Sequence, residues 1–192
     1  IYIHSQAQSL NVSFNLSNYI GYNISCHGFS DASIQTVVTG GHPPYTFNWS
    51  NNSTTQNISG LAAGDYILSM YDSTNTLAFR DTITLVQPDS LYAVLIPTVY
   101  GGFNISRKNG NDGIVDAQFY GGTPPYGYWW EPYGANYLPF NERSAGDQTI
   151  IFYDANDCYA NKSVVLTEPD ALHISSISSD STTCHGGNDG TA

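Results

Sequence analysis

The sequence repeats itself with a fixed period, and this period limits the fold more than any other feature. Gly40–Tyr45 returns 81 positions later as Gly121–Tyr126, with identical residues at every position but the third. Ala63–Asp65 returns as Ala145–Asp147, and the Pro-Asp pair at 88–89 returns at 169–170. Matched motifs at one period are the signature of a repeat architecture. The unit that must fold is therefore a repeat of about 80 residues.

The matched motifs divide the chain into four parts. Residues 1–7 align with the last strand of a repeat, 8–88 and 89–169 are two full repeats, and 170–192 align with the opening of another. The sequence begins without methionine and without a signal-peptide pattern. We therefore expect the chain to be a window on a longer array.

Each repeat consists of short strand patterns separated by turn residues. Segment 45–50 alternates apolar and polar residues strictly, so one of its faces is expected to be buried. The residues expected to face inward are Tyr45, Phe47, Trp49, Tyr66, Leu68, Met70, Tyr126, Tyr128 and Trp130. In the first repeat the predicted strands are 10–14, 34–39, 45–50, 54–58, 64–72 and 77–86. This density of strands predicts an all-β fold of tandem Ig-like β-sandwich modules.

Composition excludes several functions. The net charge is −11 and the pI is about 4.4, so binding through the phosphates of a nucleic acid or to an anionic membrane surface is excluded. No stretch approaches the roughly 18 apolar residues of a membrane span. Few lysines and 15 tyrosines, together with the negative charge, favour an extracellular protein.

The repeats share a set of motifs, which are Gly40–Trp49, Leu61–Tyr66 and Gln87–Pro88 in the first repeat, and Gly121–Tyr126, Ala145–Asp147 and Asp154–Cys158 in the second. These motifs resemble a known family, the SprB-type repeat. The second repeat departs from the pattern at Asn141–Ser144, which lacks the usual leucine, and at Arg107, where a cysteine is typical. SprB-type repeats occur in tandem in very large surface adhesins of gliding Bacteroidota. The resemblance implies export by a type IX system, display on the outer surface, and a role in adhesion or gliding motility.

We therefore predict a structural stalk in a long extracellular adhesin or filament. Its expected partners are the neighbouring repeats of the same chain, and surface glycans or other filament chains. Two alternatives remain. One is a set of carbohydrate-binding modules of a secreted enzyme, which a catalytic domain elsewhere in the gene would reveal. The other is a self-assembling fibre or sheath subunit, which ordered lateral contacts between chains would reveal.

No catalytic, cofactor or metal site is predicted, and we expect no enzyme. Cys26–His27 and Cys184–His185 suggest a thiol or metal pair, but adjacent residues of an extended segment point apart, and Lys108–Asn109 occupy this region in the middle repeat. Asn111–Gly113 and Asn188–Gly190 lack the ligand spacing of a calcium loop and are expected to be turns. The predicted hairpin tip Asp154–Asp157 is either a solvated turn or a Ca²⁺ ligand between modules.

The three cysteines cannot form a bridge within either repeat. The first repeat has Cys26, but Thr76 stands where the second has Cys158, and the second has Arg107 where the first has Cys26. In an Ig-like sandwich the first loop lies at the exit end and the last hairpin at the entry end. Cys26 should then lie near Cys158 of the following repeat, which predicts a Cys26–Cys158 disulfide, with free buried thiols as the alternative.

The second repeat carries an unusual group of aromatic residues. Alternation places Trp129 on the outer face, where the first repeat has Asn48, and Tyr133 and Tyr137 follow it closely. Rings with a polar group suit stacking on sugars or packing at an interface. The sequence predicts either packing within the protein or a ligand contact at these three residues.

The sequence also predicts glycosylation. The Asn-x-Ser/Thr sequons lie at Asn11, Asn15, Asn23, Asn48, Asn51, Asn52, Asn57, Asn104 and Asn161, more than this composition gives by chance. The family resemblance instead implies O-linked sites in the pattern Asp, Ser or Thr, then an apolar residue, which is found at Thr82 and Ser90.

Overall fold

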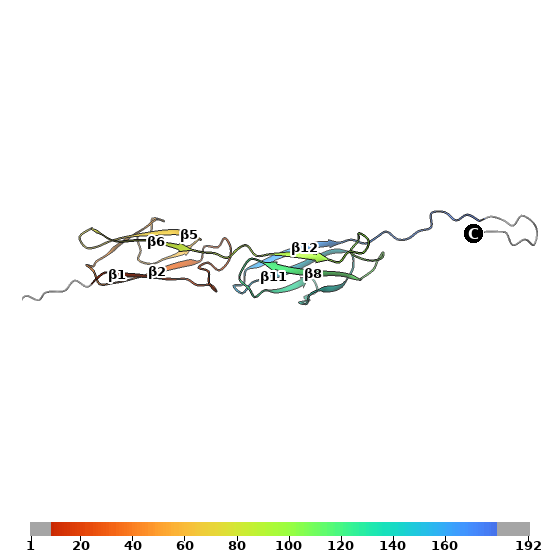
Figure 1. Cartoon of the computed structure of the whole chain (residues 1–192), viewed down its shortest axis with the longest axis horizontal. Helices are drawn as coiled ribbons and strands as arrows, with labels where there is room; N and C mark the ends of the chain where they lie inside the picture. Colours follow the sequence, from red (N-terminus) through yellow and green to blue (C-terminus); the bar gives the residue numbers. More distant parts are fainter. Residues whose placement is uncertain (1–8, 180–192) are drawn as a thin grey trace, which may run out of the picture. The chain divides into compact units, whose positions relative to one another are not determined.

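The protein is all-β. The computed structural model describes residues 9–179, and in this range the chain forms twelve strands and no helix (Figure 1). The sheets are antiparallel, and the predicted fold class of tandem Ig-like β-sandwich modules is confirmed. The predicted tail at 1–7, Cys184–His185 and Asn188–Gly190 lie outside the described residues.

The strands of the first repeat form two three-stranded sheets around one core. One sheet has the order β1-β2-β4, and the other has the order β3-β5-β6. These strands are β1 Asn11–Leu16, β2 Ala32–Thr39, β3 Thr46–Trp49, β4 Ile58–Leu61, β5 Gly64–Tyr71 and β6 Leu77–Leu85. Residues of both sheets, among them Ile34, Trp49 and Leu68, meet in the core. The predicted alternation is confirmed, because Trp49 is 2% exposed and Leu68 and Met70 are fully buried.

One predicted strand is misplaced. The segment 54–58 was expected to be a strand, but pairing begins at Ile58, opposite Ile34. The residues before Ile58 use their polar groups otherwise. Thr55 O accepts the Trp49 indole N–H at 2.9 Å, and Asn57 Oδ1 accepts the Thr36 backbone N–H at 2.9 Å. These bonds satisfy a backbone N–H group of β2 and fix the Trp49 indole. The segment before Ile58 is therefore a loop and not a paired strand.

The second repeat has the same strand pattern. Its sheets have the orders β10-β8-β7 and β12-β11-β9. These strands are β7 Tyr92–Pro97, β8 Gly113–Tyr120, β9 Gly127–Glu131, β10 Phe140–Arg143, β11 Gly146–Tyr153 and β12 Tyr159–Leu166. The Phe119 ring of β8 lies 5.2 Å from the rings of Tyr128 and Phe152, so side chains of the two sheets meet there.

By compactness the chain falls into two units. Among the described residues, the first contains 9–95 with Ala117–Tyr137 and Gln148–Ser163. The second contains Ile96–Asp116, Leu138–Asp147 and residues 164–179. In the second unit, a Cβ added at Gly113 would lie 2.6 Å from Ile105 Cδ1 and 3.0 Å from Leu166 Cδ1, which shows how tightly this glycine is packed.

The Gly-Gly-x-Pro-Pro-Tyr motif builds the same turn in both repeats. Gly40 and Gly121 have φ values of +73° and +69°, in the left-handed region that favours glycine. The hydroxyl of Tyr45 donates to Gly40 O, and that of Tyr126 donates to Gly121 O, each at 2.7 Å. The motif therefore returns because each of its ends is needed to close the turn.

Candidate binding site beside the disulfide

The tip of the last hairpin is held by an aspartate in each repeat. Asp72 Oδ1 accepts the backbone N–H groups of Thr74 and Thr76, at 2.9 and 3.1 Å. Asp154 Oδ1 accepts those of Asn156 and Cys158, at the same two distances. In the first repeat, the Thr74 hydroxyl donates to Asp72 and lowers the pKa of this carboxyl group. Cys158 of the second repeat therefore occupies the position that Thr76 has in the first repeat. The tip of the first repeat makes the same backbone hydrogen bonds without a cysteine.

An asparagine ties the opening loop of each repeat to its closing strand. The side-chain amide of Asn23 donates to Ser17 O at 3.0 Å, and its oxygen accepts the Val86 N–H at 2.9 Å. Asn104 makes the equivalent bonds to Thr98 O and to the Thr167 N–H, both at 3.0 Å. This role was not predicted, although Asn-Ile-Ser recurs at both positions one period apart.

A second tie holds the linker that follows each repeat. The Gln87 side chain accepts the Gly28 N–H at 2.9 Å, and Glu168 accepts the Asn109 N–H at 2.6 Å. Glu168 also pairs with Lys108, N to O 2.7 Å. The hydrogen bond from Lys108 lowers the pKa of Glu168, and Glu168 raises the pKa of Lys108. Both repeats thus fix the start of their linker against their own opening loop.

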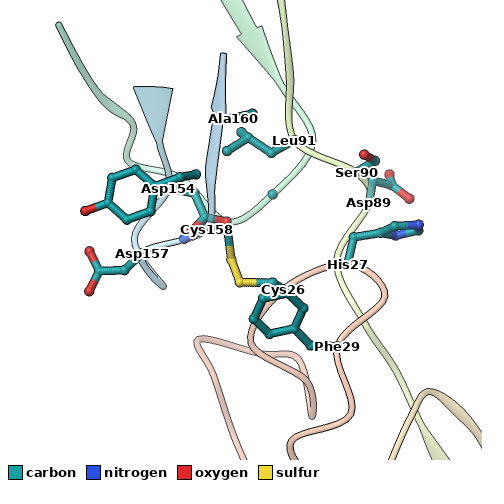
Figure 2. A pocket seen from close by; sticks show the side chains of 12 residues that line it. Cys26, His27, Phe29, Asp89, Ser90, Leu91, Asp154, Asp157, Cys158 and Ala160 are labelled. Carbon is teal, nitrogen blue, oxygen red and sulfur yellow. A yellow bond between two sulfur atoms is a disulfide. The ribbon is translucent and has the colours of Figure 1, made fainter. Parts of the chain in front are cut away.

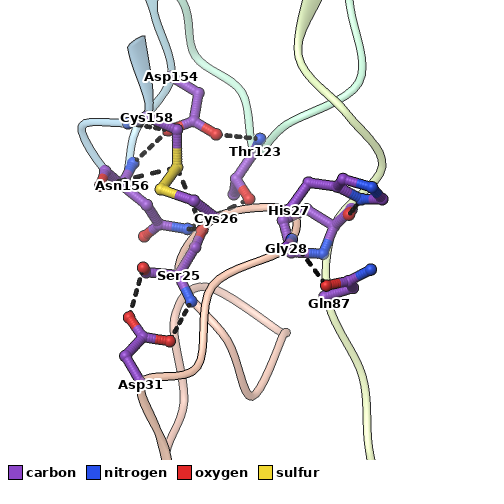
Figure 3. Close-up of a disulfide and its surroundings, with 11 residues drawn as sticks. Ser25, Cys26, His27, Gly28, Asp31, Gln87, Thr123, Asp154, Asn156 and Cys158 are labelled. Atoms are coloured by element: carbon purple, nitrogen blue, oxygen red, sulfur yellow. Dashed lines mark hydrogen bonds between the residues drawn. A yellow bond between two sulfur atoms is a disulfide. The ribbon is translucent and has the colours of Figure 1, made fainter. Parts of the chain in front are cut away.

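Cys26 and Cys158 are joined by a disulfide (Figure 3). Their Cα atoms lie 5.7 Å apart, within the roughly 7 Å that allows a bond. Hydrogen bonds accompany the bridge, since the Asn156 side chain donates to Ser25 O at 3.3 Å and to Thr123 Oγ1 at 3.2 Å. The opening loop of the first repeat and the hairpin tip of the second, both parts of the first compact unit, are therefore covalently linked.

A cavity of about 480 Å³ lies beside this disulfide (Figure 2). All of its lining residues belong to the first compact unit, and none of them is Lys or Arg. Figure 2 shows Asp89 and Asp157 on opposite sides of the disulfide, with Phe29 between them. The cavity is thus an acidic and partly aromatic hollow, which the sequence analysis did not anticipate.

The hairpin tip Asp154–Asp157 does not present all its carboxylate oxygens to this cavity. Asp154 is only 1% exposed, and its second oxygen accepts the Thr123 N–H at 2.8 Å. Both carboxylate oxygens of Asp154 therefore accept hydrogen bonds from backbone N–H groups. Among residues 9–179 there is no group of three or more His, Cys, Asp or Glu side chains that could hold a metal ion.

The predicted aromatic contact residues lie in different surroundings. Trp129 is half-buried, and its ring lies 6.1 Å from that of Tyr153 and 6.3 Å from that of Tyr159. Tyr153 lies directly across from Gly127, where an added Cβ would come within 2.1 Å of its ring. Tyr133 and Tyr137 are 58% and 46% exposed. Trp129 thus packs on tyrosines from β11 and β12, partners that the sequence analysis did not name.

The glycosylation sequons also differ in their surroundings. Asn23 and Asn104 are half-buried and use their amides in the ties described above. Asn57 is exposed but accepts the Thr36 N–H. The other predicted acceptor residues are exposed: Asn11, Asn15, Asn48, Asn51, Asn52, Thr82, Ser90 and Asn161.

Comparison with known proteins supports the resemblance that the motifs suggested. The family model of the SprB repeat matches residues 22–54, which confirms the resemblance over this stretch. No curated protein matches the chain. Among solved structures, a crystal structure of a C-terminal 282-residue fragment of intimin, in complex with the intimin-binding domain of the translocated intimin receptor, is similar at 12% identity with a TM-score of 0.38. The match covers 82% of this chain and 64% of that one, so this chain spans less than two thirds of the intimin fragment.

Among residues 9–179 no helix is long and apolar enough to cross a membrane.

Proposed function

We propose that this chain is a segment of a cell-surface adhesin in which 8–88 and 89–169 are successive modules of a load-bearing stalk. The proposal rests on one observation, which is that equivalent hydrogen bonds hold the ends of both repeats. Asn23 and Asn104 fasten the closing strands, and Gln87 and Glu168 fasten the linkers. The match of the SprB repeat model to residues 22–54 supports a surface adhesin-type repeat.

These bonds suit a stalk for a physical reason. A tandem array transmits force through its linkers, and a linker fixed by two side chains bends less than a free one. The Cys26–Cys158 bond adds a covalent tie, which a chain exported to an oxidising environment retains. We further propose that the array serves attachment or gliding, that it is exported by a type IX system, and that the exposed sequons or Thr82 and Ser90 carry glycans.

Surface display is the part of this proposal that can be tested most simply. Antibodies raised against the purified chain should label intact cells of the source organism. The expected result is labelling without permeabilisation, which disappears after brief protease treatment of whole cells. Labelling that requires permeabilised cells would contradict the proposal. An antibody to a cytoplasmic protein serves as the control for cell integrity.

A further inference from the structure

The cavity beside the disulfide offers hydrogen-bond acceptors. The carboxylates of Asp89 and Asp157 are exposed and make no hydrogen bond or ion pair to another residue in the described range 9–179. His27 Nδ1 lies 3.0 Å from Pro88 O. Because a carbonyl only accepts, Nδ1 carries the hydrogen of this bond. The two carboxylates therefore favour a ligand that donates hydrogen bonds.

The same cavity exposes aromatic surface. Phe29 is 55% and Tyr159 62% exposed, and both line the cavity. An aromatic face attracts ammonium and guanidinium groups, and it also packs against the aliphatic stems of Lys and Arg. Aromatic rings beside two exposed carboxylates thus match a cation, which compensates their negative charge, better than a neutral polyol, which does not.

We propose that this cavity binds a lysine- or arginine-rich segment of a partner protein. Asp89 and Asp157 stand on opposite sides of the disulfide (Figure 2), and a segment with several cationic side chains can pair with both carboxylates. The net charge of −11 draws such a segment toward the chain. The inference rests on the proposed adhesive function and assigns it a contact site.

The second repeat provides an internal comparison. One period after Cys26, His27 and Asp89 stand Arg107, Lys108 and Asp170, which line a separate cavity of about 550 Å³. Two of these three residues are cations, and Lys108 is paired with Glu168. Of these two cavities, only the one at the disulfide has acidic residues without Lys or Arg in its lining, so the proposed site does not recur at the equivalent position of the second repeat.

The test is titration of the oxidised full chain with a fluorescent hexalysine peptide, followed by anisotropy. The double variant Asp89→Asn with Asp157→Asn should weaken binding by about tenfold or more, because it removes both charge-assisted contacts. Asparagine suits position 157, where φ is +59°, since it tolerates the left-handed conformation. The single variants Asp89→Asn and Asp157→Asn should each weaken binding, whereas Asp81→Asn, on β6 and outside the cavity, removes the same single charge and should leave the affinity unchanged.

The outcomes separate this inference from its rivals. Selective loss in the double variant, together with weakening by salt, supports the site. Absence of hexalysine binding, or equal loss in the Asp81→Asn control, overturns it. Binding of a neutral oligosaccharide that is lost in the double variant, without hexalysine binding, would assign the cavity to a glycan and also overturn it. None of these outcomes bears on surface labelling of whole cells, so failure here is distinguishable from failure of the proposed function.

Discussion

Replacing Trp49 by alanine should lower the free energy of unfolding of the first repeat by about 3–5 kcal/mol, the range for truncating a large buried aromatic. Trp49 is 2% exposed and lies in the core formed by both sheets. Its indole N–H also donates to Thr55 O at 2.9 Å, so the variant leaves this loop without one of its ties.

Urea unfolding followed by circular dichroism measures this effect. Val37→Ala is the control, because Val37 is 43% exposed on β2 and should change stability by less than about 0.5 kcal/mol. A loss below about 1 kcal/mol for Trp49→Ala would show that β3 turns its other face to the core.

Replacing Gly121 by alanine should destabilise the second repeat severely. The new Cβ would lie 1.9 Å from Ser90 O, a backbone atom that cannot rotate away. The residue also has a φ of +69°, which costs an alanine about 1–2 kcal/mol before any clash is counted. We expect a total loss above about 3 kcal/mol, since relief of the contact requires displacement of the chain at Ser90.

Gly101→Ala isolates the conformational part of this loss. Gly101 has a φ of +57°, but an added Cβ would meet nothing within 4 Å. It should cost only the left-handed penalty of about 1–2 kcal/mol. Equal losses at both positions in thermal unfolding would mean that Ser90 moves freely and that the turn is not packed against it.

The strands that alternate strictly were predictable from sequence, since period-two burial depends only on local pattern. Trp49 is buried as expected for this reason. The segment 54–58 was not predictable, because its role depends on Thr36 and on the Trp49 indole, two partners that lie outside the segment. A polar segment that caps a neighbouring strand has the same composition as an exposed edge strand.

The site was predictable only where the repeat itself carried the information. Comparing Cys26 with Arg107 and Cys158 with Thr76 showed which cysteines lacked a partner within their own repeat. The acidic cavity depends on Asp89, Asp157 and Phe29 meeting in space, and no sequence spacing signals this. Likewise, Trp129 was correctly separated from the buried Trp130, but its partner Tyr159 lies thirty positions away on β12.

The central claim, that a covalent tie joins successive modules of a load-bearing chain, is tested most directly by pulling the chain from its two ends. With the disulfide intact, the 132 residue steps between Cys26 and Cys158 cannot extend, and reduction should add about 440–475 Å of length at 3.3–3.6 Å per residue. The variant Cys26→Ser should show the full length with or without reductant. Equal extension of the oxidised and reduced wild-type chains would contradict the account.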